Sequence, residues 1–184
     1  EYVAKESKAQ QLDEMKLAAV ADPYVKLSIR LQATFGLRRE ESIKFRPSFA
    51  MQGDHIKLKS SWTKGGRART VPITTDDQRR LLEEVKTLAR GGALIPPLLN
   101  YVKQLHRYEK QVRHAGFSRL HGLRHEYAQQ RYLELTGWVC PARGGLRSKA
   151  LNPAQRALDH EARVTISGEL GHAREAISAV YLGR

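Results

Sequence analysis

Apolar residues recur every three or four positions along most of this chain, which is the spacing of one face of a helix. Such stripes predict one helix over residues 9–21, a second from Pro23 to a stop at Gly36, and a third from Thr75 to Gly91. Further helices are expected between Pro97 and Gly116, over residues 120–135, and along a C-terminal stripe of Ala173, Ala176, Ile177 and Val180.

Capping signals support several of these helix boundaries. Asp22 before Pro23 is the expected N-cap followed by the first helical residue, because proline tolerates the first turn. Thr75 and Gln78 have the spacing of a capping box. In the helix after Pro97 the apolar positions are expected to be buried, namely Leu98, Val102, Leu105 and Val112.

The apolar period changes to two between Ile43 and Ile73, which predicts strands near residues 44–50, 55–61 and 68–73. Residues 62–67 contain two glycines and are expected to form a hairpin tip. The pattern as a whole predicts an α+β fold that is mainly helical, with a small three-stranded antiparallel sheet. The tip and its neighbourhood carry the basic residues Lys64, Arg67 and Arg69, which suit either a solvated turn or contacts to a phosphate backbone.

Residues 137–164 show glycine and proline punctuation, many basic residues and no clear period. This composition predicts a long basic loop with a short helix after Asn152 and Pro153.

The charge of the chain points to a polyanionic partner. Lysine and arginine number 32 against 19 acidic residues, giving a formal net charge of +13 over 184 residues. We expect a single domain over residues 1–184 that is a fragment of a longer protein. The single cysteine, Cys140, is compatible with a reducing compartment, and no apolar run approaches the length of a membrane span. A cytoplasmic, nucleoid-associated location is therefore expected.

His121 and Arg124 stand three residues apart, so on a helix they project from nearly the same face. Three interpretations are open: a metal site using His121 and His125, a hydrogen-bonded core histidine, or a phosphate site. A metal site is the weakest of the three interpretations because no HExxH pattern is present. No metal or other cofactor is expected. Arg38 and Glu41, also three apart, fit a surface ion pair worth under about 1 kcal/mol.

Four segments together resemble the tyrosine recombinases of the phage-integrase family. In order along the chain, they are GLRREESIKF, TKGGRARTVPI, LHGLRHEYAQ and ELGHAREAISAVYL. They are similar to that family's first arginine box, its hairpin lysine, its His-x-x-Arg box, and its Leu-Gly-His followed nine residues later by tyrosine. The resemblance implies a catalytic domain for site-specific DNA recombination or integration. It points to the catalytic residues Arg38, Lys64, His121, Arg124, His172 and Tyr181.

The resemblance also implies roles for these residues. Tyr181 would attack the scissile phosphate to form a covalent phosphotyrosine, His121 would accept the phenolic proton, and Lys64 would protonate the leaving oxygen. The arginines and His172 would hold the non-bridging oxygens, with Glu41 supporting them from behind. Lys57, Lys59 and Arg67 remain alternatives to Lys64. On one uninterrupted helix, His172 and Tyr181 would face nearly opposite sides, so a break between them is expected.

The same resemblance implies duplex DNA as substrate, a homo-tetramer as the working assembly of the full-length protein, and possible accessory DNA-bending proteins. Compared with the family pattern, this sequence is expected to lack the N-terminal core-binding domain. The interval from Arg124 to His172 is also longer than is usual in the family, so residues 137–160 are expected to be an insertion. Two other functions remain open. One is relaxation of DNA by an enzyme like a type IB topoisomerase, and the other is a non-catalytic basic DNA-binding module.

Overall fold

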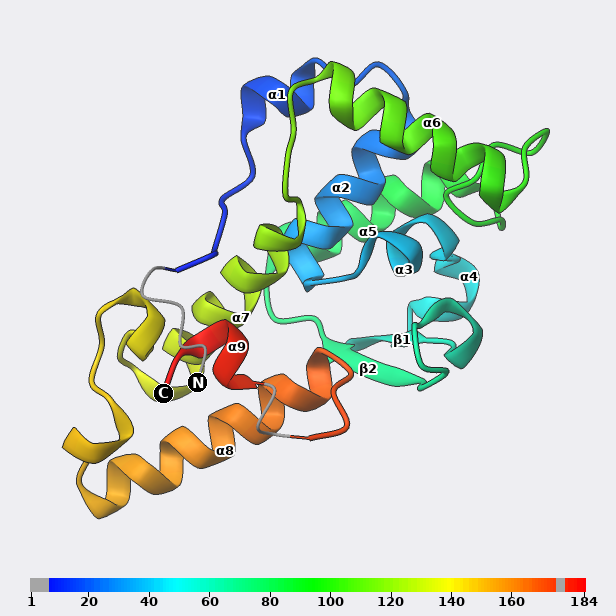
Figure 1. Cartoon of the computed structure of the whole chain (residues 1–184). Coiled ribbons are helices and arrows are strands. Elements are labelled where there is room, and N and C mark those ends of the chain that lie inside the picture. The colour runs from blue at the N-terminus through cyan, green and yellow to red at the C-terminus, as the bar shows by residue number, and fades with distance from the viewer. Residues whose placement is uncertain (1–6, 175–177) are drawn as a thin grey trace.

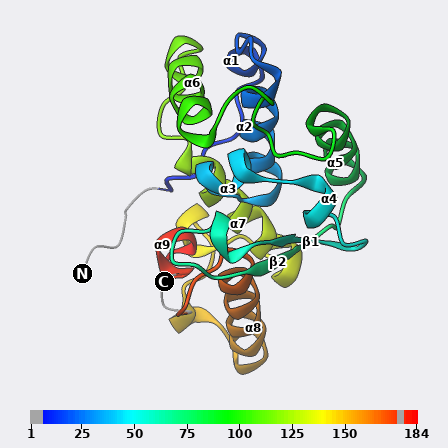
Figure 2. The ribbon, with the colours of Figure 1, turned by 90° about the vertical axis from the view of Figure 1, so that its right-hand side faces the viewer.

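Helices make up most of the computed structural model, which describes residues 7–174 and 178–184 (Figure 1). Figure 2 shows α1 and α6 at one end of the molecule, α8 at the other, and α7 with both strands between them. The helix α7 contacts α2, α8 and α9. The helices are α1 Glu14–Ala18, α2 Pro23–Phe35, α3 Arg39–Lys44, α4 Pro47–Ala50, α5 Asp76–Ala89, α6 Tyr101–His114, α7 His121–Thr136, α8 Pro153–Glu169 and α9 Ser178–Leu182.

The capping residues act as the sequence predicted. The side chain of Asp22 accepts hydrogen bonds from the first backbone amides of α2, and Pro23 is the first residue of that helix. At the other end, Gly36 adopts a left-handed φ of 65° and ends α2. Thr75 and Gln78 form the expected capping box at the start of α5. The helix over 9–21 is shorter than predicted, because only Glu14–Ala18 is helical in this range.

The sheet has two antiparallel strands in the described part of the chain, so the prediction of three strands is wrong. The strands are β1 His55–Leu58 and β2 Arg69–Pro72, with Ile56 opposite Val71. The missing strand was expected over 44–50. This range instead holds the end of α3 and the short helix α4, since Pro47 supplies a first helical residue that needs no amide donor. The adjoining Met51 makes one isolated bridge to Ile56.

Two further expectations need correction. The helix α6 begins at Tyr101 with Asn100 as its cap, so Leu98 lies outside it and is 95% exposed; Val102 is also exposed. The expected basic loop is irregular only up to residue 152, with two short 3-10 turns at Pro141–Arg143 and Ser148–Ala150. Beyond it α8 runs for 17 residues. A full capping box at its start and the buried residues Ala162 and Ile166 one turn apart favour this helix over a loop.

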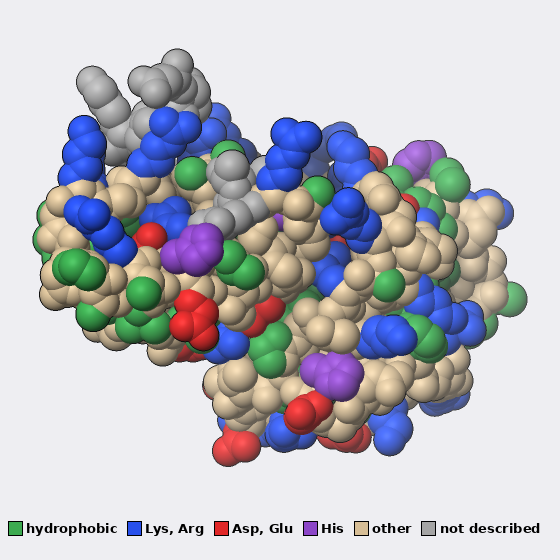
Figure 3. Space-filling model, turned by 90° about the horizontal axis from the view of Figure 1, so that it is seen from below, with side chains coloured by type: hydrophobic (Ala, Val, Ile, Leu, Met, Phe, Trp, Pro, Cys, Tyr) green, Lys and Arg blue, Asp and Glu red, His purple; other side chains and the backbone are tan. Residues whose placement is uncertain are grey.

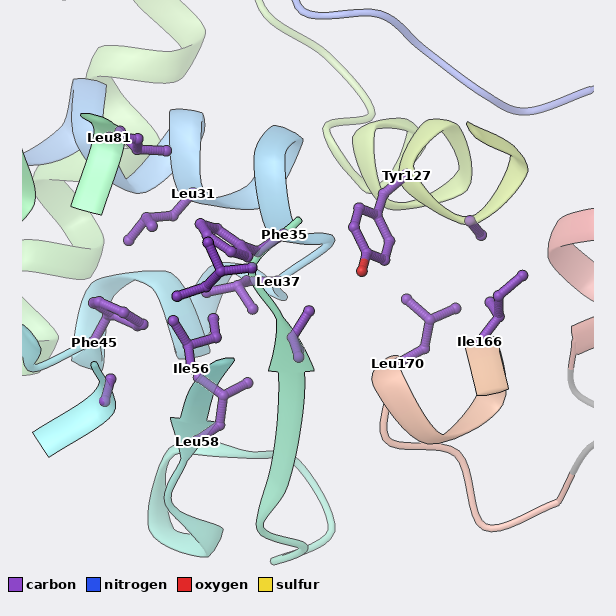
Figure 4. Packing of buried hydrophobic residues seen from close by; sticks show 14 of the residues in the cluster. Leu31, Phe35, Leu37, Phe45, Ile56, Leu58, Leu81, Tyr127, Ile166 and Leu170 are labelled. Atoms are coloured by element: carbon purple, nitrogen blue, oxygen red, sulfur yellow. The ribbon is translucent and has the colours of Figure 1, made fainter. Parts of the chain in front are cut away.

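The core lies between the central helices and the sheet. Figure 4 shows Phe35 and Leu37 packed above Ile56 and Leu58 of β1, with Tyr127 reaching from α7 toward Leu170. A second cluster of buried residues joins α1, α2, α3, α6 and α7. These two clusters fix α7 from both sides, and α7 carries the His-x-x-Arg motif.

The described residues contain no helix with the length and apolarity that crossing a bilayer requires. Of the expected C-terminal stripe, Ala176 and Ile177 lie outside the described residues. Val180 belongs to α9 and is exposed, so it does not form part of a buried stripe.

Candidate active site

Arg124 is the buried centre of the site. Its side chain is 1% exposed and is held by backbone carbonyls: Nη1 donates to Gly36 at 2.6 Å, and Nη2 donates to Leu170. Nε donates to the hydroxyl of Tyr181 at 3.3 Å. Burial, followed by the charge of Arg38, lowers the pKa of Arg124 to about 10, so the guanidinium stays protonated at neutral pH. The helix end at Gly36 therefore orients the cation of the site.

Tyr181 lies among three histidines and Arg124. Its hydroxyl is 3.3 Å from Nε2 of His121, and its ring stacks on His172 with centroids 5.3 Å apart. The ring of His125 lies 4.4 Å from that of Tyr181. His172 follows the end of α8 in non-helical backbone, whereas Tyr181 belongs to α9. The two residues are thus not on one uninterrupted helix, as the sequence required.

All three histidines are biased toward the neutral form. Burial, and then the charges of Arg124 and Arg38, lower the pKa of His121 below its usual 6.5. Burial and the charge of Arg124 lower the pKa of His172 to about 4. For His125, burial and the neighbouring His121 lower the pKa to about 4. At neutral pH, His121 can therefore accept a proton from the Tyr181 hydroxyl.

Glu41 is not a surface residue. It is fully buried, and its carboxylate accepts two hydrogen bonds of 2.7 Å from Arg69 and one of 3.0 Å from Nη1 of Arg38. Burial alone would raise the pKa of Glu41, but the hydrogen bonds and charge of Arg69 lower it to about 2. The surface ion pair expected for Arg38 and Glu41 is therefore replaced by a buried network that fixes Arg38.

Arg69 does not lie on an exposed basic tip. Its side chain is 5% exposed, and besides binding Glu41 it donates from Nε to the carbonyl of Glu169 at 2.7 Å. The expectation that Arg69 contacts DNA from the hairpin is wrong, because its guanidinium is already committed to these two buried partners. It connects β2 to α3 and to the end of α8.

Lys64 and Arg67 are exposed at the tip between the strands. Lys64 lines an open cleft together with Arg38 and His121, so the structure brings the hairpin lysine to the same cleft as the site. Other basic residues along this cleft are Arg39, Arg113 and Arg119. None of the three was predicted as a site residue, although the basic residues Arg113 and Arg119 are close together in the sequence around the end of α6.

Two polar residues lie behind Tyr181: His125, which the sequence suggested only as a metal ligand beside His121, and Gln129, which was not predicted. They follow His121 at intervals of four residues on α7, and both are at most 4% exposed. A polar stripe at helical spacing on a buried face was the available signal. Arg163 of α8, which is also buried, carried no comparable signal because its segment was expected to be a loop. No group of three potential metal ligands occurs within 7–174 and 178–184.

The sequence matches the integrase family over residues 2–130. This chain belongs to the integrase family. The matched range includes Arg38, Lys64, His121 and Arg124, and the geometry above adds His172 and Tyr181 to them. No curated protein matches the sequence of this integrase.

Solved structures share the fold of this integrase at low sequence identity. The catalytic domain of bacteriophage HP1 integrase is 18% identical, with a TM-score of 0.53 over 94% of this chain and 86% of that one. The XerH site-specific recombinase bound to difH substrate is 19% identical, with a TM-score of 0.52 over 96% of this chain and 51% of that one. The integrase from mycobacterium phage Brujita is 19% identical, with a TM-score of 0.51 over 100% of this chain and 65% of that one. This integrase thus spans about half the length of the XerH chain.

The family match and the shared fold confirm the main predictions from the sequence. The chain has the catalytic-domain fold of a tyrosine recombinase, and at the level of the family it is a DNA breaking and rejoining enzyme for site-specific recombination. The alternatives of a topoisomerase and of a non-catalytic DNA-binding module are not favoured.

Proposed function

We propose that this integrase cleaves and rejoins duplex DNA through a covalent bond between Tyr181 and a 3′ phosphate. The observation that carries the proposal is the position of the Tyr181 hydroxyl, which lies 3.3 Å from both Nε2 of His121 and Nε of Arg124. A phenol between a proton acceptor and a fixed cation is arranged for attack on a phosphodiester.

The proposed step conserves charge and bonds. The oxygen of Tyr181 forms a bond to phosphorus while the bond from phosphorus to the 5′ oxygen breaks. His121 accepts the phenolic proton, and Lys64 gives a proton to the departing 5′ oxygen. Arg38 and Arg124 hold the non-bridging oxygens, whose charge grows in the transition state. Rejoining reverses these transfers, so no external energy source is needed.

His172 supports the same phosphate in this proposal. Its Nε2 is 3.4 Å from Nη2 of Arg124, and its Nδ1 is buried without a hydrogen-bond partner in the described structure. A phosphate bound to Arg124 would lie beside this imidazole and accept a hydrogen bond from it. Glu41 contributes by holding Arg38 and Arg69 in place, and it does not touch the DNA in this scheme.

The surface charge supports duplex DNA as the partner. Figure 3 shows a face on which Lys and Arg side chains are widely spread, with fewer Asp and Glu side chains among them. The formal charge of +13 favours a polyanion over a small substrate. A homo-tetramer on DNA, accessory DNA-bending proteins and a cytoplasmic, nucleoid-associated location remain part of this proposal.

The test is incubation with nicked suicide DNA that carries a recombination site, followed by denaturing electrophoresis. We expect a covalent protein–DNA adduct with the wild type and none with Tyr181→Phe. Tyr101→Phe is the matched control, because Tyr101 lines the cleft but lies outside the proposed chemistry, and it should form the adduct. An adduct that persists in Tyr181→Phe would refute the assignment of the nucleophile.

A further inference from the structure

The nucleophile lies on a very short helix. The five residues of α9 cannot hold a helix by their own hydrogen bonds, because isolated helices need about 12–15 residues to be stable in water. The position of Tyr181 must therefore come from contacts with the rest of the protein. Figure 1 shows α9 lying against α7, with α8 passing below it.

Two buried side chains bind the carboxyl end of α9. Nε2 of Gln129 donates to the backbone carbonyl of Tyr181 at 2.9 Å, and Nη1 of Arg163 donates to the carbonyl of Gly183 at 2.9 Å. Carbonyls at a helix end have no partner within the helix, so side chains that cap them fix both the end and its direction. Gln129 comes from α7 and Arg163 from α8, and the end is thus held from two elements.

Both side chains are themselves held rigidly. Gln129 is 1% exposed and exchanges hydrogen bonds with the hydroxyl of Ser7, at 2.8 and 3.1 Å. Nε of Arg163 contacts both carboxylate oxygens of Asp159 at 3.0 Å. Asp159 in turn accepts a hydrogen bond from Tyr132 at 2.5 Å.

The segment after α7 also contributes to the surface on which α9 packs. Nε1 of Trp138 donates to the Tyr132 hydroxyl at 3.2 Å, which connects this segment to the Asp159 and Arg163 pair. A Cβ atom on Gly183 would lie 2.8 Å from the backbone nitrogen of Ala142. The chain after Tyr181 therefore packs directly on the segment that the sequence analysis expected to be an insertion.

We propose that Gln129 and Arg163 are positioning residues that hold α9 so that the Tyr181 hydroxyl stays between His121 and Arg124. This inference rests on the proposed function insofar as Tyr181 is the nucleophile. Small displacements of reacting groups cost large factors in rate, so loosening the end of α9 should slow attack without weakening DNA binding. The contacts are made within one chain, and thus the nucleophile is seated by its own domain.

The first test uses Gln129→Met, which keeps the size of the side chain and removes the donor. We expect the single-turnover rate of adduct formation at saturating suicide DNA to fall about tenfold, the effect of one lost hydrogen bond, with the dissociation constant for DNA within about twofold of wild type. Gln104→Met is the matched control, because Gln104 is also fully buried but lies on α6, and its amide has no hydrogen-bond partner in the described part of the chain; its rate should stay within about twofold. A wild-type rate in Gln129→Met would overturn the proposal.

Gln129→Leu provides a second variant if the methionine protein folds poorly. It also has no donor for the Tyr181 carbonyl, so the same loss of rate is expected. Arg163→Lys, which keeps the charge and a donor, should lose less activity than Arg163→Met. Equal losses in these two variants would contradict a role through the Gly183 carbonyl.

A readout independent of catalysis separates this proposal from the proposed function. Amide hydrogen exchange in Leu182 and Gly183 should be faster in Gln129→Met than in the wild type or Gln104→Met, because the end of α9 loses the hydrogen bond from Gln129. If the wild type forms no adduct, the proposed function fails, and exchange alone decides whether Gln129 holds α9. Unchanged exchange would refute the positioning role in either case.

Discussion

Glu41 shows how a single buried carboxylate organises the arginines of the site. It is fully buried, and it binds Arg69 through two hydrogen bonds and Arg38 through one. We predict that Glu41→Gln lowers the free energy of unfolding by about 3 kcal/mol or more, because Arg69 would keep its buried charge without a counterion. Urea unfolding of the two proteins measures the difference.

The exposed pair of Arg30 and Glu84 is the natural comparison for Glu41. Its distance of 2.5 Å is short, but both side chains are substantially exposed. Glu84→Gln should therefore cost less than about 1 kcal/mol. Equal losses in the two variants would mean that burial does not set the strength of the Glu41 network.

His121 should set the acid limit of DNA cleavage. Burial and the charges of Arg124 and Arg38 lower its pKa below 6.5, so it is neutral above that pH and can accept the phenolic proton. Below its pKa the imidazole becomes protonated and the acceptor is lost. We predict that the single-turnover cleavage rate stays flat to below pH 6.5 and falls, by at most about tenfold per pH unit, only below the lowered pKa of His121. An acid limb above pH 6.5 would contradict this role.

At the residue scale, the sequence predicted which residues come together at the site better than it predicted which of their neighbours are buried. The spacing of His121 and Arg124 and the four family segments selected residues that the structure brings together. Arg69 was placed on the surface because a basic residue near a glycine-rich tip looks exposed. Its burial depends on Glu41, which is 28 residues away in the sequence, and no local pattern reports such a pairing.

At the element scale, the end of α2 is a sensitive point. Gly36 has a φ of 65°, and a Cβ atom there would lie 2.6 Å from the ring of Tyr127. Its carbonyl also accepts a hydrogen bond from Arg124. We predict that Gly36→Ala destabilises the protein by more than the roughly 1 kcal/mol that a left-handed backbone conformation costs a non-glycine residue. Cleavage should also slow, because the Gly36 carbonyl that orients Arg124 would be displaced.

Gly137 is a matched control for Gly36. It ends α7 with a φ of 87°, and a Cβ atom there would meet nothing within 4 Å. Gly137→Ala should therefore cost only the strain and leave the cleavage rate unchanged. Thermal unfolding and the single-turnover assay together distinguish the two glycines, and the prediction fails if both variants behave alike.

Local signals explain which elements were predictable. The capping residues of α2 and α5 lie next to the helices that they cap, so they can be recognised locally, and both helices begin as predicted. The segment 44–50 alternates like a strand, yet Pro47 starts α4 and the helix α3 continues to Lys44. The length of α8 depends on packing of Ala162 and Ile166 against α7. Such tertiary contacts cannot be predicted from a local sequence that is basic and contains several glycines and prolines.

At the scale of the whole molecule, α7 connects the separate parts of the site. It contacts α2, which ends at Gly36; α8, whose end leads to His172; and α9, which carries Tyr181. The hairpin tip supplies Lys64 from outside this helical centre, at an open cleft. The buried groups are thus fixed before DNA arrives, whereas the exposed lysine can adjust to the DNA backbone.

The excess positive charge predicts a steep dependence of DNA binding on salt. Each phosphate contact releases counterions, so the logarithm of the binding constant should fall with the logarithm of salt concentration by a slope of about −0.9 per contact. Lys64→Ala and Arg67→Ala should each reduce that slope by about one contact, since both side chains are exposed at the tip. Fluorescence anisotropy with labelled duplex DNA at several salt concentrations measures the slopes.

Arg80→Ala tests whether this effect is specific to the tip. Arg80 is exposed on α5 and pairs with Asp77, and it lines a different groove from the one that holds Arg38 and His121. Removing it lowers the net charge by the same amount as removing Lys64, so a purely global attraction would change both slopes alike. We expect the slope to change for Lys64→Ala and to stay at the wild-type value for Arg80→Ala. Equal changes would mean that the net charge of the molecule, and not contact at the cleft, sets the affinity for DNA.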